Sequence, residues 1–192
     1  MSTTNDDLTY LSWVAEELKA YLLSNELYWP SGARFSSGNT PSNPITPGNL
    51  LFAQTMLEIR LQAGELDSKN EAEFKEVSQQ IDAIQQEWRS AWENKVSRDL
   101  QSRLRQWIDK LDEIGKMGGD LSAYYSSAVR ERVLITLLAD ELSGDTFPEA
   151  ELLAIQDQRL RKISSESEFV WEEKLEGGFD KTKHWYLYRH PV

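Results

Sequence analysis

The sequence predicts a mainly α-helical protein, an elongated bundle of about five helices with a short aromatic β-hairpin or an extended C-terminal tail. Apolar residues recur at three- and four-residue spacing over long stretches, which is the period of an amphipathic helix. Capping residues, prolines and glycines mark where these stretches begin and end. After about residue 163 the sequence changes to short aromatic segments that favour β-structure.

Length and composition are those of a folded globular protein. The chain has 192 residues, of which 40% are hydrophobic and 28% are charged. Such a length fits one domain, or one domain with an appendage. We therefore expect a helical bundle over residues 1–163 and an aromatic appendage over 164–192 that packs on it.

The first expected helix covers about residues 6–24, because leucines, valine and tyrosines there follow the helical period. Residues 24–46 are rich in Pro, Gly, Ser and Asn, which predicts a long irregular loop. Loops of this length in compact domains are often functional. Thr46 followed by Pro47 then predicts the start of a second helix, which ends at Gly64.

The longest expected helix covers about residues 68–114, where the sequence has neither glycine nor proline. A capping box at Ser68–Glu71 marks its start. Its apolar residues recur about every 3.6 residues from Phe74 to Ile114, so they form one continuous stripe. Unbroken, this helix would be roughly 70 Å long, whereas a compact chain of this size is about 40 Å across. We therefore expect an elongated molecule, or a break near Glu93–Asn94 or Ser97.

Two further helices and a tail complete the expected fold. Asp120 can cap a helix over 121–142, whose later half is apolar nearly all round and so belongs in the centre of the bundle. A second capping box at Thr146–Glu149 predicts a helix to about residue 163. The aromatic segments Phe169–Trp171 and Trp185–Tyr188 then form a hairpin around Gly177–Gly178, or lie extended across the bundle.

The charge of the chain disfavours nucleic acid and anionic membranes as partners. The net charge is −11 and is spread along the whole sequence. Cations over Arg89–Lys110 alternate with acids, which favours ion pairing along the helix and leaves nucleic-acid binding as an alternative role for this segment. The sequence shows no signal peptide and no apolar stretch long enough for a membrane span, so a cytoplasmic location is expected.

The sequence contains no recognisable catalytic, cofactor or metal motif. It has no cysteine and only two histidines, His184 and His190, without the Glu-x-x-His spacing of di-iron bundles. A hydrolytic triad using His184 would lack the Gly-x-Ser-x-Gly turn that presents its nucleophile. We expect no cofactor, no bound metal and no enzymatic activity.

Large aromatic residues are the candidate partner contacts, because seven tryptophans are unusual in a chain of this length. Some of these residues lie in the irregular loop, one lies on the long stripe and others lie in the tail. The candidates are Tyr28, Trp29, Phe35, Trp92, Trp185 and Tyr188. Packing within the protein is the competing interpretation for each, and it is the favoured one for the loop and tail aromatics as well as for Trp92.

The sequence therefore predicts a non-enzymatic protein that acts through protein–protein contact, as a scaffold, an adaptor or a subunit of an assembly, with a protein partner or a second copy of itself. The basis is an apolar stripe longer than one compact domain can cover. The alternative is a ligand-binding or catalytic bundle with a site between helices. That alternative requires a pocket lined by Tyr28, Trp29, Tyr124 or Tyr125 together with converging polar groups.

Overall fold

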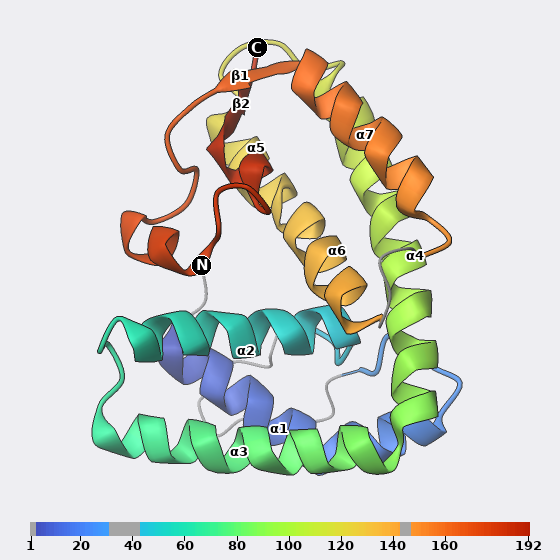
Figure 1. Ribbon diagram of the computed structural model, residues 1–192, viewed down its shortest axis with the longest axis vertical. Helices are drawn as coiled ribbons and strands as arrows, with labels where there is room; N and C mark the ends of the chain where they lie inside the picture. Colours follow the sequence, from blue (N-terminus) through green and yellow to red (C-terminus); the bar gives the residue numbers. More distant parts are fainter. Residues whose placement is uncertain (1–2, 31–42, 143–146) are drawn as a thin grey trace. The chain divides into compact units, whose positions relative to one another are not determined.

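The computed structural model describes residues 3–30, 43–142 and 147–192 (Figure 1). The predictions for Phe35 and for a cap at Thr146 lie outside these residues. The fold is mainly α, as predicted, with seven α-helices and one two-stranded antiparallel sheet over the described part. The chain forms two compact units, Met1–Asp99 and Leu100–Val192, so residues 164–192 belong to the second unit together with the later helices.

The first unit contains α1 (Thr4–Leu23), α2 (Pro47–Gln62), α3 (Ser68–Glu87) and the first part of α4 (Arg89–Ile114). The Thr46 hydroxyl caps α2 by accepting from the Asn49 amide at 3.2 Å, as its sequence predicts. The cap of α3 is one residue earlier than predicted, because the Asp67 carboxylate accepts from the Asn70 amide at 2.8 Å.

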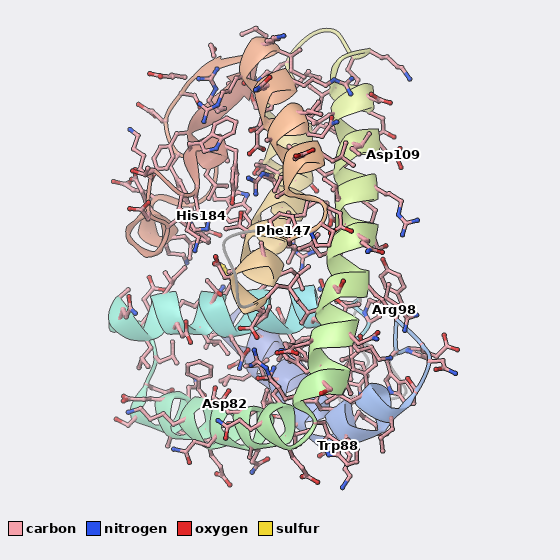
Figure 2. All side chains as sticks on the ribbon, turned by 45° about the vertical axis from the view of Figure 1, so that its right-hand side comes forward. Asp82, Trp88, Arg98, Asp109, Phe147 and His184 are labelled. Carbon is pink, nitrogen blue, oxygen red and sulfur yellow. The ribbon has the colours of Figure 1, made fainter. Side chains whose placement is uncertain are left out.

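The helix expected over 68–114 is not continuous, because the chain turns sharply at Trp88 between α3 and α4 (Figure 2). The break thus lies at Trp88 and not near Glu93–Asn94 or Ser97, where it was expected. Trp88 has φ −113° and ψ 36°, outside the helical region. The hydrogen bonds Trp88 N–H to Ile84 C=O and Trp92 N–H to Trp88 C=O are both made, at 3.0 and 2.9 Å. The turn allows α3 to pack against α1, so burial of its apolar face outweighs the local helical preference.

A buried ion pair links α1 to α2 inside the first unit. Arg60 donates to the Asp7 carboxylate at 2.6 Å, and these side chains are only 6% and 8% exposed. The buried Asp99 of α4 accepts from the Gly48 amide at 2.8 Å and so holds α4 to the start of α2. The fully buried apolar side chains around these contacts include Leu11, Val14, Leu18, Tyr21, Ile45, Leu50, Met56, Leu57, Ile81 and Val96.

The second unit contains the rest of α4 with α5 (Ser122–Ala128), α6 (Arg130–Glu141) and α7 (Ala150–Lys162). The helix predicted over 121–142 is thus two helices that meet at Val129. Six successive residues of α6, Glu131–Thr136, are buried, which confirms its predicted central place. Arg132 of α6 donates two hydrogen bonds of 2.8 Å to Asp157 of α7, which fixes the two helices together.

The tail forms strands at other residues than the sequence predicts. Strand β1 (Ser164–Glu166) pairs antiparallel with β2 (Arg189–Pro191), and the turns η1 (Glu173–Gly178) and η2 (Trp185–Tyr188) lie between them. The small hairpin of the tail is therefore confirmed, but its strands are not the aromatic segments Phe169–Trp171 and Trp185–Tyr188. Three successive residues of η2, Tyr186, Leu187 and Tyr188, are buried. A tight helical turn can bury three in succession, whereas a strand at the surface exposes every second one.

Within the described residues, no helix combines the length and the apolar character that a membrane crossing requires.

Candidate functional site

Two of the described candidate partner contacts, Trp92 and Tyr188, are buried. Trp92 is only 1% exposed, which confirms core packing for this ring, and Tyr188 is also buried. Trp29 is half-buried, lies edge-on to Tyr21 with ring centroids 6.4 Å apart, and pairs through its backbone with Ile45. Tyr28 remains 40% exposed. These findings leave Tyr28 as the most accessible of the described candidates in the first unit.

The apolar stripe that suggested a partner is covered by the chain itself. Most of its residues are buried in the structure, and those with less than a tenth of their surface exposed are Phe74, Val77, Ile81, Trp92, Val96, Leu100, Leu104, Trp107, Leu111 and Ile114. The turn at Trp88 makes this possible, because α3 and α4 each find separate neighbours. The premise of an uncovered stripe is therefore wrong.

The cations of the Arg89–Lys110 segment are largely used inside the protein. Arg103 and Lys110 contact the two carboxylate oxygens of the buried Glu131 at 3.1 and 3.2 Å. Lys95 is buried, its ammonium lies 4.3 Å from the centre of the Tyr21 ring, and burial lowers its pKa. Arg89 pairs with Glu93 along the helix at 2.6 Å. This pairing favours a structural role for these cations over contact with nucleic acid.

A cavity of about 300 Å³ lies within the second unit, between α5 and the C-terminal segment. Helix α5, residues 167–170 and strand β2 supply its walls. The lining residues are Ser122, Tyr125, Ser167, Glu168, Val170, Arg189 and His190. Tyr125 is thus one of the rings that the ligand-binding alternative requires. Tyr124 instead donates a hydrogen bond to Glu113, and Tyr28 and Trp29 belong to the first unit.

Asp120, Ser122 and His190 form a hydrogen-bonded chain at the cavity. The Ser122 hydroxyl donates to Asp120 at 2.5 Å, and His190 Nε2 lies 3.1 Å from the same hydroxyl oxygen. Because the Ser122 hydroxyl uses its proton in the hydrogen bond to Asp120, His190 Nε2 is the donor in the hydrogen bond between His190 and Ser122. The hydrogen bonds from Ser122 also lower the pKa of Asp120.

This chain differs from a hydrolytic triad. In a triad the histidine takes the serine proton, and the carboxylate holds the opposite ring nitrogen. Here Asp120 binds Ser122 directly, and His190 Nδ1 has no hydrogen-bond partner among the described residues. The arrangement orients His190 and Ser122, and it differs from a triad in that the serine hydroxyl donates to the carboxylate instead of to the histidine.

Arg189 is held rigidly at the cavity and keeps unused donors. Its Nε donates to the Ser164 hydroxyl at 3.1 Å, and its Nη2 donates to the carbonyls of Arg161, at 3.2 Å, and Ser164. A guanidinium has five N–H groups. Over the described part of the chain, the two on Nη1 make no hydrogen bond. They are available to an acidic group.

Glu168 supplies the opposite charge at the same cavity. Its carboxylate accepts no hydrogen bond from any described residue, and the side chain is exposed. The backbone around it is fixed, because the amides of Ser167 and Val170 donate to the carbonyls of Tyr188 and Leu187 at 3.0 and 2.9 Å. Val170 and the Tyr125 ring add apolar surface. The Tyr125 hydroxyl is occupied, since it donates to the Tyr186 carbonyl at 2.7 Å.

His184 is buried among the aromatic rings of the tail rather than at the cavity (Figure 2). Its ring centroid lies 5.1 Å from that of Phe179 and 5.9 Å from that of Tyr186. Neither ring nitrogen has a hydrogen-bond partner in the described part of the chain, and burial lowers the pKa of the imidazole. Its environment is that of a neutral core histidine, with no serine hydroxyl bonded to it.

The structure offers no obvious metal centre in the residues that it describes, where no three His, Asp or Glu side chains converge. Of the cavity residues, the sequence pointed to Tyr125 as a possible lining ring. Ser122, Ser167, Glu168 and Val170 were missed. No local pattern marks them, because they meet only through the packing of the tail on α5.

Comparison with known proteins assigns no role to the cavity residues. No protein-family model matches this chain, and no curated protein or solved structure matches it either.

Proposed function

We propose that the second unit binds a small zwitterionic molecule, of about amino-acid size, in the cavity between α5 and the tail. One observation carries this proposal: Arg189 and Glu168 line the same cavity with hydrogen-bonding capacity that the described residues leave unused. An acidic group of the ligand would bind Arg189, and an amino group would bind Glu168. Both contacts are charge-assisted, which makes them about twice as strong as neutral hydrogen bonds.

The size and the lining of the cavity support this class of ligand. A volume of about 300 Å³ is at the small end of ligand pockets. The Tyr125 ring and Val170 can cover an aliphatic body, while Ser122 and His190 are already oriented by Asp120. A positive and a negative side chain together favour a ligand that carries both charges over a simple anion.

We propose that the second unit binds its ligand without catalysing a reaction on it. The Ser122 hydroxyl donates its hydrogen bond to Asp120, and because the pKa of this carboxylate is lowered, Asp120 is a weak base for activating the hydroxyl. The protein would then act as a carrier or a sensor of its ligand. Binding would also stabilise the second unit, because a ligand that binds only the folded state shifts the unfolding equilibrium.

The test is calorimetric titration of the full chain with each of the twenty L-amino acids. Succinate serves as the acid-only probe and putrescine as the amine-only probe. At least one zwitterion should bind, and Glu168→Gln should weaken it about tenfold or more, since a lost charge-assisted bond costs about 1.5–3 kcal/mol. The matched control, Glu173→Gln, changes an exposed acid outside the cavity and should have no effect.

Arg189→Lys keeps the charge and tests the second anchor, with circular dichroism verifying the fold. Weaker zwitterion binding in this variant agrees with the proposal. If no zwitterion binds the native chain, or if Glu168→Gln binds as tightly as the Glu173→Gln control, the proposal is wrong.

Protein–protein interaction remains the second candidate function, now for a different reason. The long stripe is covered, but Leu152 and Ile155 on α7 are 41% and 59% exposed. They are three residues apart on one helix and so lie on neighbouring turns.

A further inference from the structure

Helix α7 has an outward face that no described residue covers. Leu153, Gln156 and Leu160 face the interior of the second unit. The opposite face carries Glu151, Ile155, Gln158 and Lys162, at spacings of four, three and four residues, and Leu152 lies beside it. All five of these residues are exposed.

The charges on this face are arranged in a self-complementary order. The acid Glu151 is near the beginning of α7 and the base Lys162 is at its end, with Ile155 between them. Eleven residues of helix separate the two charges by about 16 Å, so they cannot pair within one helix. Neither has an ion-pair partner among the described residues. The other bases at this end are engaged, Arg159 with Asp112 and Arg161 over the Trp185 ring.

We propose that two copies of the chain associate through antiparallel contact of their α7 helices. A two-fold axis midway between Ile155 and Gln158 puts Glu151 of each copy opposite Lys162 of the second copy. The same axis brings the two Ile155 side chains to the centre, with Leu152 at the edge. Such a contact is isologous, since each copy contributes the same face.

Local charge favours a second copy over an unrelated acidic or basic partner. The whole chain has a net charge of −11, but α7 contains two acids and three bases. Two α7 helices can therefore approach antiparallel with opposite charges in register, while the rest of the surface is acidic. One helix on each side buries less than the roughly 1,000 Å² of a stable interface, so the association is weak and depends on protein concentration.

The experiment is sedimentation equilibrium of the full chain over a concentration series. The native protein should show a concentration-dependent monomer–dimer equilibrium. Ile155→Glu should abolish it. Glu151→Lys and Lys162→Glu should each weaken association about tenfold, because each converts two attractive pairs into two repulsive ones. Circular dichroism verifies that every variant retains its helical content.

Mixing the two charge variants gives the sharpest test. In a dimer of one Glu151→Lys copy with one Lys162→Glu copy, both charge pairs join opposite charges, so the mixture should associate more tightly than either variant alone. Glu173→Lys, which leaves α7 unchanged, mixed with Lys162→Glu is the matched control, and this mixture should gain no association beyond the self-association of Glu173→Lys. A native chain that stays monomeric at all concentrations overturns the proposal. A mixture of Glu151→Lys with Lys162→Glu that is no more associated than either variant alone overturns it as well. That outcome would point instead to an unrelated partner for this face.

Discussion

Replacement of Trp92 by alanine tests whether the long apolar stripe is buried within the protein. The Trp92 ring is 1% exposed and lies in the first unit with Val96 and Ile81, both of which are fully buried. Truncation of a fully buried tryptophan removes its transfer free energy and leaves a cavity, which costs about 3–5 kcal/mol. A domain of about 100 residues loses roughly 4–8 °C in Tm for each kcal/mol. The expected fall for the first unit is therefore at least about 12 °C.

The assay is urea and thermal unfolding of the full chain followed by circular dichroism. Tyr28→Ala is the matched control, because Tyr28 belongs to the same unit and is 40% exposed. Its expected cost is under about 1 kcal/mol. A loss below about 1 kcal/mol for Trp92→Ala would refute the burial of this ring and return Trp92 to the surface as a partner contact.

Two further experiments test buried polar groups. Arg60→Met should destabilise the first unit by about 3–5 kcal/mol in urea unfolding, because it leaves Asp7 buried without its cation, whereas the double variant with Asp7→Leu should regain most of that loss. An equal loss in the double variant would contradict this. His184, whose pKa is lowered from 6.5 by burial, should make the second unit less stable as pH falls below that value, because the unfolded chain takes up the proton first. His184→Gln should flatten this pH dependence in thermal unfolding, and an unchanged slope would argue against a buried neutral imidazole.

The helices were largely predictable, because their signals are local. Thr46 and Pro47 mark the start of α2 whatever the tertiary structure, and the periodicity of the stripe correctly gave the buried faces of α3 and α4. The turn at Trp88 was not predictable in the same way. Tryptophan is no helix breaker, and the turn is favoured by packing between α3 and α1, which only the three-dimensional structure reveals.

The tail and the cavity were harder to predict for the same reason. Aromatic residues favour strands, yet Tyr186 to Tyr188 form a tight turn because all three are buried. Ser122 and His190 are hydrogen-bonded although 68 residues separate them. The spacing of residues along the sequence cannot predict this contact, because His190 lies on β2, a strand that the sequence did not predict.

The most direct test of zwitterion binding is to locate the ligand by NMR. Amide and Arg side-chain ¹H–¹⁵N spectra of the full chain are recorded while the tightest-binding amino acid is added. The proposal predicts saturable shifts at Ser122, Ser167, Glu168 and His190 and at the Arg189 guanidinium, with the amides of α1 and α2 unchanged. Shifts confined to the first unit, or no saturable shifts around the cavity, would contradict it.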